Sequence, residues 1–173
     1  MRSHLLRFGI LVFLLSACEK TEPDYPDEPV IDYKGFSFAV STDELGNKNL
    51  YGYLQFDFVD GDGDLGMAEP DTLQVDPANL PDSLKYNFYV QVHDWKDAEF
   101  VAVPEEEGGL LKYRIPYLDK QPLKGSLELE IAYPLIVFDT VFYTFYIVDR
   151  AYHHSNTDTS EVLVLTGFDL SEL

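Results

Sequence analysis

Apolar side chains alternate with polar or small ones over much of this chain, in several separate segments. The alternation covers residues 35–40, 53–58, 86–93, 126–131 and 141–148. A period of two puts alternate side chains on opposite faces of an extended strand, whereas a helix needs a period of 3.6. We therefore expect a chain built of strands. Residues 80–84 are expected to form at most one helical turn.

Turn-forming residues separate these segments. They are Gly46-Asn47, the run 60–66, Gly108-Gly109 and Ser155-Asn156. Short alternating strands with such spacing favour two antiparallel sheets packed face to face. We predict an all-β, antiparallel, immunoglobulin-like β-sandwich of about seven or eight strands. The segment 141–148 is apolar on both faces, as expected of a central strand that is covered on both sides.

The first eighteen residues have the pattern of an export signal. Arg2 and Arg7 precede an apolar run from Phe8 to Leu15, and small residues lead to Cys18. The apolar run is too short to span a bilayer, which takes about 20 residues. Cys18 is the single cysteine of the chain, so it has no partner for an internal disulfide.

The segment Leu15-Ser16-Ala17-Cys18 resembles the lipobox of bacterial lipoproteins. The resemblance implies cleavage before Cys18 and acylation of that residue, which would anchor the chain to a membrane. The alternative is an ordinary secretory signal with a chance cysteine. We expect a signal peptide at 1–17, an acylated Cys18 with a short disordered, acidic, Pro-rich tether at 18–31, and the sandwich at 32–173.

The charge of the chain restricts its partners. The formal net charge is −19, and removal of Arg2 and Arg7 with the signal makes it more negative. This charge argues against nucleic acid as a partner, because its binding requires Lys and Arg to neutralise phosphates. The charge favours solubility, a cation or a basic partner. A well-solvated surface accounts for most of the carboxylates.

One acidic loop has the spacing of a calcium ligand set. Asp60, Asp62 and Asp64 alternate with glycines, which permit the tight backbone that converging carboxylates require. Ca²⁺ accepts six to eight oxygens in flexible geometry. We predict Ca²⁺ at Asp60, Asp62 and Asp64, with Asp71 as a possible fourth ligand. The alternative is an acidic turn whose side chains bond nearby backbone N–H groups.

Two segments resemble known proteins. Residues 145–165, FYIVDRAYHHSNTDTSEVLVL, look like the last two strands of fibronectin-III or immunoglobulin-like modules. Residues 54–66, LQFDFVDGDGDLG, resemble a segment of small, poorly characterised lipoproteins of Bacteroidota. These resemblances imply the sandwich fold and a lipid-anchored place in the outer membrane. Exposure at the cell surface is favoured over the periplasmic face.

Familiar catalytic patterns are absent from the sequence. It contains no GxSxG, HExxH or P-loop motif, and an acylated Cys18 could not serve as a nucleophile. We therefore expect a non-catalytic accessory or interaction subunit of an outer-membrane complex. The first alternative is a surface glycan-binding module in which Trp95 contacts the ligand. A small hydrolase is the second alternative.

Replacement of Cys18 by serine is predicted to release the chain from membranes, because serine cannot form the thioether to lipid. Cell fractionation of the Cys18→Ser variant and intact-mass measurement of the parent check this. A parent without acyl chains, together with a variant that still partitions into membranes, would contradict the prediction.

Overall fold

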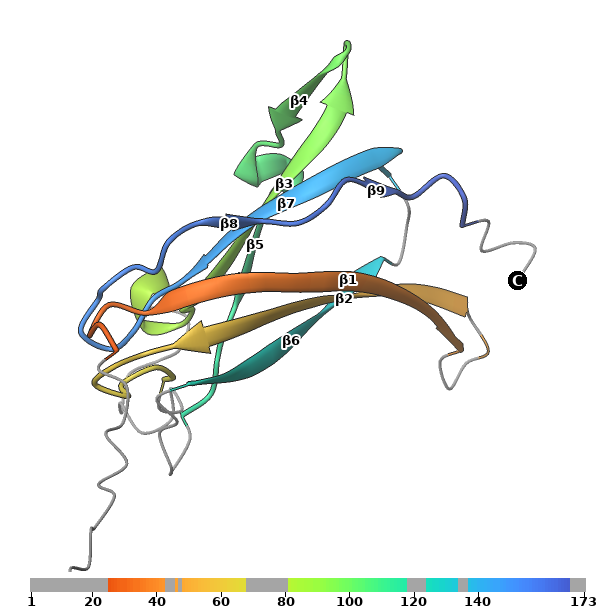
Figure 1. Ribbon diagram of the computed structural model, residues 1–173. Coiled ribbons are helices and arrows are strands. Elements are labelled where there is room, and N and C mark those ends of the chain that lie inside the picture. Colours follow the sequence, from red (N-terminus) through yellow and green to blue (C-terminus); the bar gives the residue numbers. More distant parts are fainter. Residues whose placement is uncertain are drawn as a thin grey trace, which may run out of the picture.

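The computed structural model describes residues 25–42, 46, 48–67, 81–117, 124–133 and 137–168. Cys18 and Asp71 therefore lie outside the described residues. The predicted all-β sandwich is confirmed: two antiparallel sheets lie one above the other (Figure 1). The strands are β1 (Val30–Thr42), β2 (Lys48–Val59), β3 (Phe88–Lys96), β4 (Glu99–Ala102), β5 (Leu110–Tyr113), β6 (Lys124–Tyr133), β7 (Thr140–Ile147), β8 (Asp158–Thr159) and β9 (Leu163–Val164).

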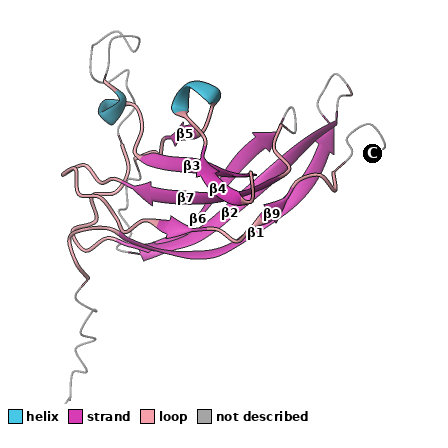
Figure 2. Cartoon of the chain, turned by 90° about the horizontal axis from the view of Figure 1, so that it is seen from above, coloured by secondary structure: helices cyan, strands magenta, loops and turns pink. Residues whose placement is uncertain are grey.

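Helical structure in the described part of the chain is limited to short 3₁₀ turns, drawn as coils in Figure 2. They are Asp82–Leu84 and Glu105–Glu107. The first is the single turn expected near residues 80–84. No helix among the described residues is long and apolar enough to cross a membrane.

The strands divide between the sheets as in immunoglobulin-like sandwiches. One sheet has the order β1-β2-β6, and the other has the order β4-β3-β7-β8. β5 also pairs with β3, and β9 also pairs with β7. At each edge of the second sheet, two short strands therefore take the place of one interrupted strand. This accounts for nine strands among the described residues, where the sequence predicted seven or eight.

The predicted alternation places one face of each strand in the core. In β2, Leu54 and Phe56 are buried, and they lie opposite Leu129 and Leu127 of β6. In β7, residues 141, 143, 145 and 147 are buried, while the outward residues Phe142 and Tyr146 are only partly covered. The outer face of β7 is thus less covered than its two-sided apolar sequence predicts.

Aromatic rings join the two sheets. Phe56 of β2 packs against Phe88 of β3 at 5.1 Å and against Phe145 of β7 at 5.4 Å between ring centroids. Also within the core, the hydroxyls of Tyr133 and Tyr143 lie 2.5 Å apart and share a hydrogen bond. That bond satisfies two buried hydroxyls that would otherwise destabilise the core.

The first strand starts earlier than the expected domain boundary at residue 32. Val30 and Ile31 belong to β1, and both Pro29 and Ile31 are buried. Ile31 is a core residue, so the last residues of the segment assigned to the tether belong to the sandwich.

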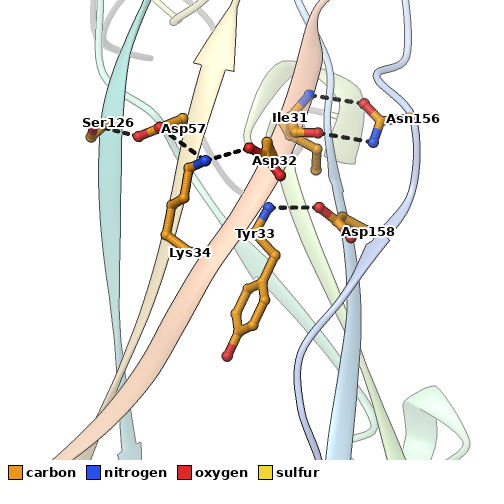
Figure 3. A network of polar contacts seen from close by, with 8 residues as sticks. All are labelled: Ile31, Asp32, Tyr33, Lys34, Asp57, Ser126, Asn156 and Asp158. Atoms are coloured by element: carbon orange, nitrogen blue, oxygen red, sulfur yellow. Dashed lines mark hydrogen bonds and ion pairs between the residues drawn. The ribbon is translucent and has the colours of Figure 1, made fainter.

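Two polar side chains from the last part of the chain hold the free edge of β1, as Figure 3 shows. The amide of Asn156 accepts a hydrogen bond from the N–H of Ile31 at 2.8 Å and donates one to its carbonyl at 3.0 Å. The carboxylate of Asp158 accepts the N–H of Tyr33 at 2.6 Å. These bonds connect the two sheets at a strand edge that would otherwise be unpaired.

Asn156→Ala and Asp158→Ala are each predicted to destabilise the fold by about 1–3 kcal/mol, because each leaves partly buried backbone groups of β1 without partners. Asp32→Ala is the matched control, since Asp32 forms an exposed ion pair with Lys34 and such pairs contribute about 0–1 kcal/mol. Denaturant unfolding measures all three variants. Equal losses for Asn156→Ala and Asp32→Ala would contradict the prediction.

Candidate functional site

The acidic loop begins where β2 ends. Phe58 points into the core and Val59 points outward, so Asp60 points inward again. The Asp60 side chain is 0% exposed, and its Oδ2 accepts the N–H of Leu65 at 2.7 Å. This bond closes the loop on itself and fixes the direction of the carboxylate.

Glycines let the backbone of this loop pack closely against its neighbours. Gly61 donates its N–H to the carbonyl of Pro26 at 2.8 Å, and a Cβ at Gly61 would lie 2.3 Å from the carbonyl oxygen of Tyr25. Gly66 has a φ of 101°, and a Cβ there would lie 2.6 Å from the carbonyl oxygen of Pro116. The loop is therefore a packed element that tolerates no side chain at either position.

A third carboxylate comes from the end of β7. Asp149 follows Ile147 and Val148, and its side chain is 0% exposed. Its Oδ1 accepts the backbone N–H of His153 at 2.8 Å, and its Oδ2 lies 3.0 Å from the His153 Nδ1. The charge of Asp149 is the main reason that the pKa of His153 is raised.

Asp60, Asp64 and Asp149 meet at one point. Each offers a carboxylate oxygen, and these oxygens all lie within 4.8 Å of one another. We call these three residues the acidic centre. The Oδ1 atoms of Asp60 and Asp64 are buried and have no hydrogen-bond partner among the described residues.

Burial and neighbouring carboxylates disfavour the ionised forms of Asp60 and Asp64, although Arg150 acts in the opposite direction on Asp64. Burial, followed by the charges of Asp62 and Asp64, raises the pKa of Asp60 to about 6. Burial and the charge of Asp149 also raise the pKa of Asp64. Because the pKa of Asp60 is higher in the folded state, this group costs stability as pH rises from about 4 through about 6.

Of the calcium ligands predicted from the sequence, the structure brings two together and leaves a third apart. Asp60 and Asp64 converge in the acidic centre, whereas Asp62 is exposed and is not one of the converging group. Asp71 lies outside the described residues. Trp95 lies on β3, paired with Phe100 across the β3–β4 hairpin, and is 48% exposed.

Sequence reasoning missed Asp149 as a member of the site. One sequence feature could have identified it: Asp149 follows the apolar segment 141–148, much as Asp60 follows the segment 53–58. The connections that follow β2 and β7 lie at the same end of this sandwich, at the left of Figure 1. Only that topology brings together two carboxylates separated by nearly ninety residues.

The chain matches no protein-family model, no curated protein and no solved structure. Its function is therefore inferred from the geometry of the site itself.

Asp60→Asn is predicted to make the protein more stable than the parent in the presence of a chelator, by about 1–3 kcal/mol. The amide oxygen keeps the bond to the N–H of Leu65, while the amide nitrogen can donate to the carboxylates of Asp64 and Asp149. Asp62→Asn, in the same loop but exposed, should change stability by less than about 0.5 kcal/mol. Denaturant unfolding measures both, and a less stable Asp60→Asn would contradict the prediction.

Proposed function

We propose that the chain is a non-catalytic, lipid-anchored accessory protein of the cell envelope, and that its sandwich binds Ca²⁺ at Asp60, Asp64 and Asp149. The observation that carries the calcium site is the pair of buried Oδ1 atoms, on Asp60 and Asp64, without partners among the described residues. Buried charged oxygens are costly unless a cation or donor compensates them. A cation at this point would compensate all three carboxylates.

The chemistry of the acidic centre favours Ca²⁺ over transition metals. Its donors are carboxylate oxygens, which hard cations prefer, and the described residues that converge there include no sulfur or imidazole ligand. Two oxygens bound to one Ca²⁺ are at most about 5 Å apart, since each bond is about 2.4 Å. The 4.8 Å spread of the three oxygens satisfies this limit. Backbone carbonyls and water would complete the coordination.

Position also supports cation binding over acid–base catalysis. The two carboxyls with raised pKa values, Asp60 and Asp64, are absent from the described lining of the neighbouring cavity. A catalytic acid must come within hydrogen-bond distance of its substrate. Their positions suit an ion held between two loops better than a reaction in the cavity.

The accessory role in a larger outer-membrane assembly rests on a different feature. The outer face of the larger sheet carries Trp95, Phe100 and Phe142 in ring contacts at 4.8 Å, whereas the outer face of the other sheet is largely polar. Aromatic residues are enriched at protein interfaces. A Trp95→Ser variant that still migrates with the same detergent-extracted complex as the parent would contradict docking through this face.

Calcium is predicted to raise the unfolding midpoint of the parent protein. With a Kd of about 10⁻⁴–10⁻³ M, typical of extracellular modules, a tenfold excess over Kd would add about 1.4 kcal/mol of stability. Thermal unfolding with Ca²⁺, with Mg²⁺ and with a chelator measures the effect. Asp60→Asn and Asp149→Asn should lose it, whereas Asp62→Asn should keep it.

Two outcomes would contradict the assignment. Equal midpoints of the parent in calcium and chelator, with no heat on calcium titration, would exclude the site. A calcium response that is lost in Asp62→Asn and kept in Asp149→Asn would place the ion within the loop alone, as the sequence predicted.

A further inference from the structure

A cavity of about 330 Å³ lies beside the acidic centre, and Asp149 belongs to its lining. Its walls come from Met67, from residues between 83 and 89 at and before the start of β3, and from residues between 146 and 154 at and after the end of β7. This volume is at the lower end of the range for small-molecule sites, which are mostly apolar with a few placed polar groups. The lining of this cavity likewise combines tyrosine rings and apolar side chains with a few polar groups, among them Asn87, Asp149 and Arg150.

Aromatic rings form one wall of the cavity. Tyr89 of β3 stacks on Tyr146 of β7 with centroids 5.1 Å apart, and Tyr146 stacks on His154 at 5.3 Å. Their planes are inclined by only 13° and 14°. Tyrosine offers an apolar ring together with a hydroxyl, so such a wall can contact both the apolar and the polar parts of a ligand.

A strained tyrosine lies at the edge of the cavity. Tyr152 has a φ of 67° and remains 58% exposed. A non-glycine residue in this region costs about 1–3 kcal/mol, and such residues cluster at ligand sites. The turn that holds Tyr152 includes its N–H bond to the carbonyl of Asp149 at 3.3 Å.

Asn87, one of the residues that line the cavity, has an unused hydrogen-bond donor. Asn87 is 2% exposed, and its Oδ1 accepts the N–H of Ile115 at 2.7 Å. Its Nδ2 is buried and has no hydrogen-bond partner among the described residues. Leaving such a donor unpaired costs about 1–3 kcal/mol, so a ligand that brings an acceptor oxygen would gain from it.

The charges around the cavity favour a neutral ligand. The chain is strongly acidic, with a formal net charge of −19, which disfavours an anion. The lining holds two side chains of opposite charge that already contact the protein: Asp149 accepts a hydrogen bond from His153, and the guanidinium of Arg150 lies 5.0 Å from the ring centroid of Tyr117. The lining therefore favours a neutral molecule with acceptor oxygens and an apolar face.

We propose that this cavity binds a carbohydrate, one sugar ring with its apolar face toward the tyrosines and a hydroxyl oxygen accepting from Asn87. Trp95 is not part of the cavity lining, so this site differs from the glycan contact expected from the sequence.

Calcium should strengthen sugar binding through Asp149. The same carboxylate belongs to the acidic centre and holds His153 in the loop that carries Tyr152 and His154. An ion on Asp149 would therefore restrict the loop in the arrangement that forms the cavity. Only this cation dependence rests on the proposed calcium site.

The test is titration calorimetry of the full chain with glucose, galactose, mannose and N-acetylglucosamine, in calcium and in chelator. At least one sugar should bind with a millimolar or lower Kd. Tyr152→Ala and Asn87→Asp should each weaken it about tenfold, equivalent to about 1.4 kcal/mol. Asn87→Asp keeps the acceptor for Ile115 while removing the donor, and exposed Tyr152 can be truncated with little effect on the core.

Trp95→Ala is the matched control, an exposed aromatic of the same sheet outside the cavity, and should bind as the parent does. No binding by any of the four sugars at millimolar concentration would overturn the proposal, even if calcium still raised the unfolding midpoint. Binding that is lost in Trp95→Ala but kept in Tyr152→Ala would overturn it too. Equal affinity in calcium and chelator would overturn the coupling through Asp149.

Discussion

The contact of Phe56 with Phe88 and Phe145 is the interaction on which the rest of this fold depends. It joins β2 of one sheet to β3 and β7 of the other, in the fully buried middle of the sandwich. Truncating a buried ring of this kind costs about 3–5 kcal/mol, a large share of the stability of a small domain. With these strands fixed face to face, the residues that directly follow β2 and β7 have little freedom in where they lie. The position of the acidic centre follows from this packing.

The fold was largely predictable from the sequence because its main signal is local. Alternation in 53–58 and 141–148 needs no knowledge of distant residues, and both segments are strands with the expected face buried. The start of β1 was not predictable in this way. Prolines and acids before Val30 resemble a tether, and the bonds from Asn156 and Asp158 to β1 come from residues 125 positions away, which no local pattern shows.

The acidic centre was only half predictable, because sequence patterns report local structure and one of its three residues is distant in sequence. Asp60 and Asp64 are close in sequence, and the glycines around them indicate a tight loop. Asp149 joins them through the pairing of whole strands, which no spacing rule within the loop contains. Alternation stops with the strand: Asp60 continues the inward positions of β2, whereas Asp62, two residues later, lies in the turn and is exposed.

The hydrogen bond between Gly61 and Pro26 sets an orientation for the whole molecule. It holds the start of the described chain, at Tyr25 and Pro26, against the acidic loop at that end of the sandwich. Tyr25 comes seven positions after Cys18, so the two residues can be at most about 25 Å apart. With Cys18 acylated as proposed, the loops after β2 and β7 would stay close to the bilayer. The β3–β4 hairpin, which projects past the rest of its sheet in Figure 1, would be free to point away from it.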